Sequence, residues 1–207
     1  MQLLINDESI ADELIAQRRA CGGDRYDEVW NGIYVMSPLA NNEHQNLVTA
    51  LAVVLSTLVD WKALGRTFAG VNISDQSDDW TGNYRVPDVA VFLKNSTAID
   101  RGTHYLGGPD FAIEITSRGD RTLEKLGFYA AVGTRELLVV DRRPWRLSLY
   151  KLSAVGELEL AAVVEEGSAE PIISEVLPLR LQFEAEPLRI RVANDHGETI
   201  RDIPLAS

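Results

Sequence analysis

Cysteine is nearly absent from this chain of 207 residues, which contains only Cys21. A single cysteine cannot form an intramolecular disulfide, and no base close to it in the sequence supports catalysis by its thiol. The first residues also lack the basic and long apolar stretches of a secretory signal. We therefore expect a protein of the reducing cytoplasm.

Long apolar runs are missing as well. The longest, over 50–59, is interrupted by Ser56 and Thr57, whereas a membrane helix needs about 20 apolar residues. No membrane span is predicted. A content of 45% hydrophobic and 25% charged residues is typical of a globular protein. We expect one domain over 1–207, with a helical N-terminal extension over 1–25 and a β-hairpin over 187–207.

Positive charge is scarce, because the 20 Lys and Arg are outnumbered by 31 Asp and Glu, which gives a net charge of −11. This balance argues against loose, sequence-independent adhesion to nucleic acid, since Lys and Arg contacts to phosphate supply that affinity. It does not exclude a nuclease, because a carboxylate-rich metal site is acidic until it binds metal. Basic residues also gather between 118 and 146, either to contact phosphate or as part of a solvated surface of mixed charge.

The order of predicted elements is that of a protein with both helices and strands. Asn31-Gly32 predicts a hairpin over 29–35, and Asn41 or Asn42 can cap a helix over 43–59 whose apolar face begins at His44. The other expected elements are a helix over 9–19, strands over 66–73, 85–92, 111–115 and 136–141, a helix from 120 or 122 to 132, and a hairpin over 147–163. We expect loops over 74–83 and 94–109.

Two carboxylates lie inside predicted strands, where charge is costly. Asp88 and Glu114 are each flanked by apolar, strand-favouring residues, and burying an unpaired carboxylate costs several kcal/mol, so each needs a metal ion or another cation as a partner. Neighbouring strands would bring the two side chains together. Asp110 is a rival to Asp88, but four residues along a strand place it about 13 Å from Glu114, too far to share one ion.

The order and spacing of these residues resemble the Uma-two family of restriction endonucleases, within the PD-(D/E)XK nuclease superfamily. The resemblance covers 26–152 and depends on order and spacing, because no single piece of it is specific. The matching residues are Glu28 with Gly32, Met36-Ser37-Pro38, His44-Gln45, the run 83–88, Pro109-Asp110, Glu114, Ser117, Asp120, Lys125, Tyr129, Gly133 and Glu136.

The resemblance implies an α/β (α+β) fold with a restriction-endonuclease-like core, in which a mixed central β-sheet is flanked by helices and carries extra β-hairpins. It also implies that Asp88, Glu114 and the backbone carbonyl of Ile115 bind a catalytic Mg²⁺ or Mn²⁺. Hard cations of this kind favour carboxylate oxygen and can activate water for attack on phosphorus. The superfamily's usual lysine is replaced by Thr116, and Lys125 matches the position from which this family supplies it.

Supporting roles are open at four further residues. Glu28 is either another metal ligand, an orienting group or an exposed residue before a hairpin. His44 either bonds a site carboxylate or phosphate, or is a satisfied core histidine. Tyr84 and Arg85 either contact substrate phosphate or are ordinary strand-edge residues. Asp88 and Glu114 themselves have a structural alternative as turn-capping or ion-paired residues, and Lys125 as a solvated helix lysine.

The leading hypothesis is a metal-dependent endonuclease that hydrolyses DNA phosphodiester bonds. Its competitor is a noncatalytic binding module for nucleic acid or protein on the same fold, which the displaced lysine and the acidic charge would suit. A homodimer is expected with the nuclease, because cutting both strands of a duplex is easiest with two related sites.

Overall fold

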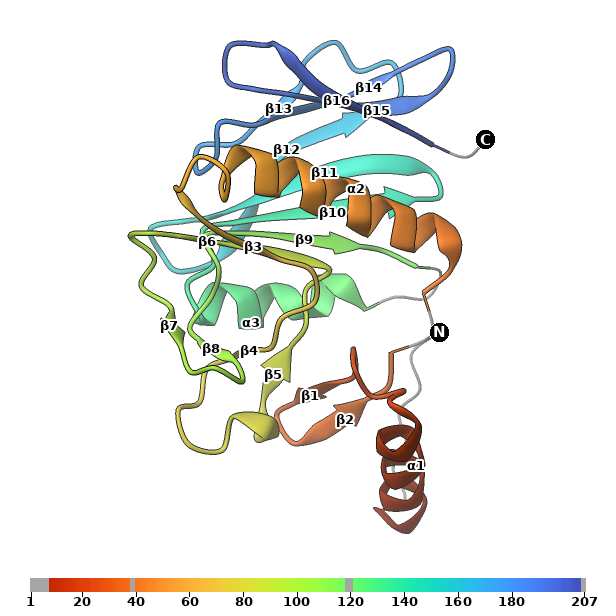
Figure 1. Cartoon of the computed structure of the whole chain (residues 1–207), viewed down its shortest axis with the longest axis vertical. Helices are drawn as coiled ribbons and strands as arrows, with labels where there is room; N and C mark the ends of the chain where they lie inside the picture. Colours follow the sequence, from red (N-terminus) through yellow and green to blue (C-terminus); the bar gives the residue numbers. More distant parts are fainter. Residues whose placement is uncertain (1–7, 38–39, 118–120, 206–207) are drawn as a thin grey trace.

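The computed structural model describes residues 8–37, 40–117 and 121–205, with the side chains of all of these except 8–11. Its central six-stranded sheet has the order β12-β11-β10-β9-β6-β3 (Figure 1). The strands are β3 Gly65–Phe68, β6 Val89–Leu93, β9 Phe111–Ile115, β10 Glu136–Arg142, β11 Trp145–Leu152 and β12 Leu158–Glu165. Strands β9 and β10 run parallel and the other neighbours antiparallel, which confirms the predicted mixed sheet.

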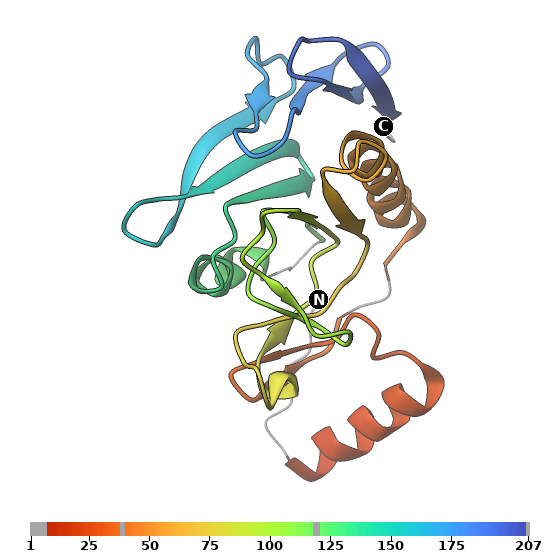
Figure 2. The ribbon, with the colours of Figure 1, turned by 60° about the vertical axis from the view of Figure 1, so that its left-hand side comes forward.

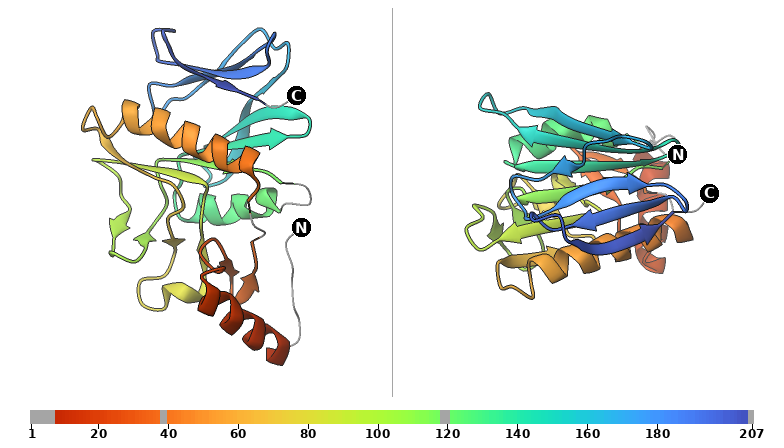
Figure 3. Two further views of the ribbon diagram at one scale, coloured as in Figure 1. Left: turned by 45° about the vertical axis from the view of Figure 1, so that its right-hand side comes forward. Right: turned by 90° about the horizontal axis from the view of Figure 1, so that it is seen from above.

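A helix and a further sheet cover one face of this sheet. The long helix α2 (Asn42–Leu58) lies along it, and a four-stranded sheet of order β13-β14-β15-β16 lies above (Figures 1 and 3). The strands of that sheet are β13 Ile172–Ile173, β14 Arg180–Glu184, β15 Arg189–Ala193 and β16 Thr199–Pro204. Strands β15 and β16 pair antiparallel within the segment where a hairpin was expected. Whether the chain forms a single domain stays a prediction.

A short helix covers the opposite face. The 3₁₀ turn η2 (Thr122–Lys125) leads directly into α3 (Leu126–Ala131), and Gly133 with φ of +83° follows the helix as expected. The predicted helix start is therefore corrected to a tighter turn. Its alternative start, Asp120, lies outside the described residues. None of the helices in the described ranges is long and apolar enough to cross a membrane.

A second six-stranded sheet, of order β2-β1-β5-β4-β8-β7, lies beyond α3. Its strands are β1 Glu28–Trp30, β2 Ile33–Val35, β4 Ile73–Ser74, β5 Tyr84–Arg85, β7 Ile99–Asp100 and β8 Tyr105–Leu106, with the 3₁₀ turn η1 (Trp80–Gly82) before β5. The β1–β2 turn has positive φ at Asn31 and Gly32, as the Asn-Gly prediction requires. Helix α1 (Glu8–Cys21) projects beyond this sheet (Figure 2).

Alternation along β9 divides the interior into two cores. Phe111, Ile113 and Ile115 pack with α2 and the C-terminal sheet, whereas Ala112 faces the cluster that contains Phe128. Glu114 has the parity of Ala112 and therefore points toward α3. The strand pattern thus places a carboxylate in an otherwise apolar layer.

Three predicted segments are corrected. The strand expected over 66–73 is two strands in different sheets, separated by a turn in which Gly70 has a φ of +70°. The strand expected over 85–92 is likewise broken, because 86–88 lie between β5 and β6, so that Asp88 precedes a strand rather than lying inside one. The loop expected over 94–109 contains β7 and β8, whose two residues each are too short to show a periodic pattern.

Candidate active site

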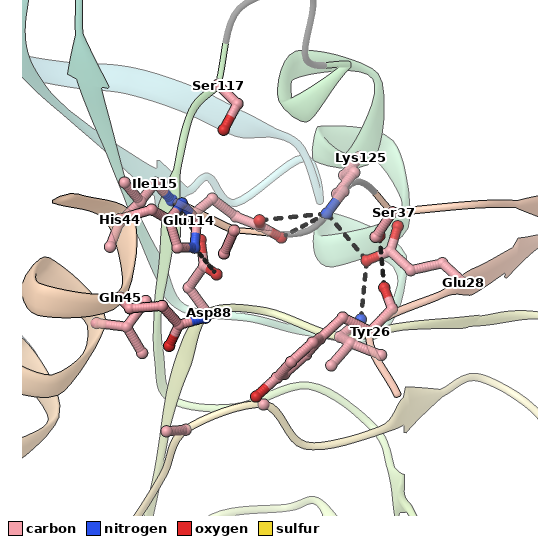
Figure 4. A pocket seen from close by; sticks show the side chains of 15 residues that line it. Tyr26, Glu28, Ser37, His44, Gln45, Asp88, Glu114, Ile115, Ser117 and Lys125 are labelled. Carbon is pink, nitrogen blue, oxygen red and sulfur yellow. Dashed lines mark hydrogen bonds and ion pairs between the residues drawn. The ribbon is translucent and has the colours of Figure 1, made fainter. Parts of the chain in front are cut away.

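A pocket opens at the carboxyl end of β9. Its walls come from segments far apart in the sequence: the start of α2, the β1–β2 region, the turn after β3, the residues before β6, and η2. Figure 4 shows Asp88, from before β6, Glu114, on β9, and Lys125, in η2, reaching this space. The predicted catalytic residues are therefore close together, although their roles stay a prediction.

Glu114 and Lys125 form a buried ion pair. The ammonium of Lys125 lies 3.0 Å from Oε1 and 3.2 Å from Oε2 of Glu114, and each side chain is only 6% exposed. The hydroxyl of Tyr129, one helical turn beyond Lys125, donates to the same carboxylate at 2.5 Å. Because η2 leads into α3, Lys125 and Tyr129 lie on the side that faces β9. This lysine is not the solvated helix residue of the structural alternative.

Glu28 is the second carboxylate on the lysine. Its Oε1 accepts from Lys125 Nζ at 2.9 Å and from the backbone N–H of Val86 at 2.9 Å, while its Oε2 accepts from the indole N–H of Trp30 at 2.7 Å. The side chain is 1% exposed, whereas an exposed residue was one of the sequence alternatives. With both oxygens engaged by protein donors, Glu28 is arranged to hold Lys125.

Asp88 is the most exposed of the three pocket carboxylates, with 21% of its side chain exposed. The pairing of Val89 with Ile113 brings the preceding Asp88 beside the end of β9, and its Oδ2 accepts from the backbone N–H of Ile115 at 2.7 Å. Its Oδ1 lies 2.8 Å from Nε2 of His44. Asn41 caps α2 by accepting from the N–H of His44, so the helix start aims this imidazole at the carboxylate.

The pocket carries excess negative charge. Three carboxylates, Glu28, Asp88 and Glu114, line it together with one lysine and His44. Burial raises the pKa of Glu114 to about 8, Lys125 opposes that shift, and the negative charges of Asp88 and Glu28 add to it. Burial and the neighbouring Glu114 also raise the pKa of Tyr129 well above its usual range, so its hydroxyl stays a donor. An added cation would relieve this repulsion.

The oxygen atoms available in the pocket are of the kind that bind a hard divalent cation. Asp88 and Glu114 supply carboxylate oxygens, and Ile115, the third predicted ligand, contributes its backbone beside Asp88. Within the described ranges, no group of three or more His, Cys, Asp and Glu side chains is arranged to hold a metal. A cation here would therefore bind to two carboxylates and complete its shell with the backbone carbonyl and water.

Two predicted supporting residues lie elsewhere. Arg85 is buried with its guanidinium between the rings of Trp30 and Phe128, 4.7 and 4.3 Å from their centroids, and it donates to the carbonyl oxygen of Val29. Neither Arg85 nor Tyr84 lines the pocket. The rival Asp110 also lies outside it, accepting from the N–H of Leu93 and pairing with Arg135. Among the described residues, the choice of Asp88 over Asp110 agrees with the geometry.

Several neighbours of the site had no assigned role in the sequence. Trp30 holds Glu28, Tyr129 holds Glu114, and Tyr26 and Gln45 line the pocket. Arg142, at the end of β10, donates to Asn41 and Glu43 at the start of α2 and also to Thr116 and Ser117 after β9. These contacts join segments that are distant in the sequence, so no local pattern predicts them. Only membership in the resembling motif marked Gln45, Ser117 and Tyr129, and Tyr26 was merely the residue at which the resemblance begins.

Comparison with known proteins agrees with this architecture. A family model described as "Uma2: Putative restriction endonuclease" matches residues 16–189. Among solved structures, a putative nuclease belonging to DUF820 from Anabaena variabilis is similar with a TM-score of 0.58 and 19% sequence identity, over 72% of this chain and 82% of the other. At this identity the likeness shows the fold alone. No curated protein matches the chain.

Proposed function

The chain belongs to the Uma2 family of putative restriction endonucleases, and from this premise we propose that it is a metal-dependent endonuclease that hydrolyses phosphodiester bonds in DNA. One observation carries the proposal. Asp88, Glu114 and Lys125, which are 26 and 11 residues apart in the sequence, line one pocket, and the lysine contacts the glutamate directly. Paired carboxylates beside a cation are the groups that metal-assisted phosphodiester hydrolysis needs.

In this proposal, Asp88 and Glu114 with the carbonyl of Ile115 hold Mg²⁺ or Mn²⁺, which when bound polarises the phosphate and activates water. The protein's own groups position the reaction. His44 and the N–H of Ile115 fix the two oxygens of Asp88. Tyr129 fixes Glu114, and Glu28 fixes the ammonium of Lys125. That ammonium would offset the charge that develops on the phosphate oxygens as water attacks phosphorus and the P–O bond breaks.

The test is cleavage of circular DNA, in both single-stranded and plasmid form, with Mg²⁺, Mn²⁺ or chelator. We expect cuts that need the divalent cation and that are lost in Asp88→Ala, because this change removes one of the two pocket carboxylates proposed to bind the metal. Exposed Asp195, which lies outside the pocket, gives the matched control Asp195→Ala, and it should cut like the wild type. Cutting by Asp88→Ala at the wild-type rate would contradict the proposal.

Metal binding can be measured without cleavage. Calorimetry with Mn²⁺ should show weaker binding for Asp88→Asn and for Glu114→Gln, with unchanged folds by circular dichroism. Unchanged affinity in both variants would remove the metal site. The alternative, a noncatalytic binding module, predicts DNA or protein binding with no cleavage by the wild type under any metal. The direct bonds from Lys125, Tyr129 and His44 to the carboxylates are compatible with that alternative.

DNA as the substrate and a homodimer as the active form belong to this proposal. Two pockets related by a twofold axis would act on the two strands of a duplex. Analytical ultracentrifugation of the full chain, with and without DNA, measures the oligomeric state. Residence in the cytoplasm stays a prediction.

A further inference from the structure

An aromatic ring lies in the wall of the pocket among the groups that would bind a phosphate. Tyr26 lines the pocket together with Asp88, Glu114 and Lys125, and Figure 4 shows its ring reaching into the space below Asp88 and Lys125. The residue is 42% exposed, so part of it is open to solvent instead of packing into a core. The proposed hydrolysis does not use this ring.

Tyr26 contacts neighbouring segments through both its ring and its backbone. Its edge lies on the backbone of Gly70, where a Cβ atom would come within 2.6 Å of Cε1 of the ring and where φ is +70°. The N–H of Gly70 in turn donates to the carbonyl oxygen of Asp88 at 3.3 Å. Ser37 donates its hydroxyl to the carbonyl of Tyr26 at 2.5 Å. The ring therefore lies against the glycine whose N–H bonds to the backbone of Asp88, a proposed metal ligand.

The reacting groups are deeply placed. Glu114 and Lys125 are each 6% exposed, and Asp88 is 21% exposed in its side chain. A phosphate must reach into the pocket to approach them. A paired strand is part of a stiff rod with a persistence length of about 150 base pairs, whereas an unpaired nucleotide can bend into a pocket and leave its base free to stack.

The net charge of the molecule also favours binding of unpaired strands over binding of a duplex. A net charge of −11 disfavours the many phosphate contacts on which tight duplex binding depends. Binding of single strands relies more on aromatic platforms, where stacking of one base contributes roughly 1–3 kcal/mol. Arg25 adds a local positive charge, with its guanidinium 5.6 Å from the centroid of the Tyr26 ring.

We propose that Tyr26 is a stacking platform for an unpaired base next to the scissile phosphate, so that DNA with unpaired nucleotides, either single-stranded or in a locally unpaired duplex, is preferred over fully paired duplex. This inference rests on the proposed function, because only a nuclease has a scissile phosphate. The recognition step itself requires only that DNA enters the pocket.

The first experiment measures binding without cleavage. Fluorescence anisotropy in chelator compares one labelled oligodeoxynucleotide as a single strand, as a duplex with one unpaired base, and as a fully paired duplex. We expect the wild type to bind the two unpaired forms about tenfold tighter than the paired form, the effect of one stacked base. Tyr26→Ala should lose this preference, and Tyr26→Phe should keep it because the ring remains.

The matched control is Trp61→Ala. Trp61 is 82% exposed and follows the far end of α2, whereas the pocket contacts the start of that helix. Its loss should leave the preference unchanged. Equal binding of paired and unpaired DNA by the wild type, or an unchanged preference in Tyr26→Ala, would overturn the inference. Thermal melting of each variant confirms that binding is compared between folded proteins.

The second experiment separates this inference from the proposed function. With Mg²⁺, the wild type should cut the unpaired substrates faster than the paired duplex, and Tyr26→Ala should lose that advantage. Cleavage of the paired duplex at the same rate as the unpaired forms would overturn the stacking role and leave the nuclease intact. A binding preference that needs Tyr26, without cleavage of any substrate, would support the platform and remove the nuclease.

Discussion

Lys125 is the residue whose surroundings depart most from an ordinary helix lysine. Its ammonium lies between the carboxylates of Glu28 and Glu114, and all three side chains are buried. Its loss would leave two buried carboxylates without their cation. We therefore expect Lys125→Met to lower the free energy of unfolding by about 3–5 kcal/mol, measured with urea in chelator.

The control for this prediction is a double variant. Adding Glu28→Gln to Lys125→Met removes one of the uncompensated charges, so part of the lost stability should return. Where Lys125→Met is folded, Mn²⁺ affinity should persist, and DNA cleavage should fall by about 10²-fold or more because a positioned electrostatic group is gone. Stability and cleavage equal to wild type would return Lys125 to a solvated surface role.

Glu114 makes the stability of the metal-free protein depend on pH. Burial raises its pKa to about 8, above the usual 4.5 that it regains on unfolding. The folded protein thus binds more protons than the unfolded chain between these values, and the contribution of Glu114 to stability is lost as pH rises. In chelator, the free energy of unfolding should fall by at least about 1 kcal/mol more between pH 5 and 8 in the wild type than in Glu114→Gln.

That comparison isolates one group, because Gln cannot ionise and every other titrating residue is shared by the two proteins. Urea unfolding at several pH values provides the measurement. Parallel pH profiles for the wild type and Glu114→Gln would show that Glu114 already ionises at its ordinary pH in the folded protein.

At the scale of elements, Arg142 connects three segments around the site. Its guanidinium donates to Asn41 and Glu43, which begin α2, and to the carbonyl of Thr116 and the hydroxyl of Ser117, which follow β9. The same end of α2 aims His44 at Asp88. Arg142 is thus placed to set the distance between a helix and the strand that carries Glu114.

We expect Arg142→Lys to slow DNA cleavage by about tenfold, because an ammonium keeps the charge and cannot match the planar fork of contacts. Helix content by circular dichroism should be retained, while the NMR signals of the His44 imidazole should move. Arg146→Lys is the matched control, since that arginine lies 3.9 Å from Glu165 outside the pocket. Identical behaviour of the two variants would leave Arg142 without a positioning role.

Elements with strong local signals were predictable from the sequence. The Asn-Gly turn, the Asn41 cap of α2 and the apolar run of β9 each follow from chemistry within a few residues. Contacts between residues far apart in the sequence were not predictable in this way. Buried Glu28 bonds to Trp30, Val86 and Lys125, and Lys125 is 97 residues away. No local pattern beside the hairpin predicts this burial, and only the family resemblance marked Glu28. Within the break at 86–88, Val86 donates its N–H to the same glutamate, and Pro87 has no N–H to donate to a neighbouring strand.

At the scale of the whole molecule, the pocket and the contact of Glu136 with residues 174–175 of the C-terminal sheet lie at opposite ends of the parallel pair β9 and β10. Glu136 opens β10 opposite Phe111, and it accepts from the hydroxyl of Ser174 and from the N–H of Glu175 at 2.9 Å. It therefore anchors the connection between β13 and β14 of the C-terminal sheet. Along the strand, Phe111 and Glu114 are about 10 Å apart, which separates this fastening from the site.

Glu136→Ala should accordingly weaken the molecule without changing the pocket. The hydroxyl of Ser174 and the N–H of Glu175 would lose their acceptor in a buried position, at a cost on the order of 1–3 kcal/mol each. Glu175→Ala is the control: its exposed carboxylate pairs with Lys151 at 2.8 Å, and such a pair contributes about 0–1 kcal/mol. Urea unfolding and Mn²⁺ calorimetry measure the two properties side by side. Metal affinity that falls together with stability in Glu136→Ala would show that the two ends of the sheet are coupled, because the substitution itself touches no group in the pocket.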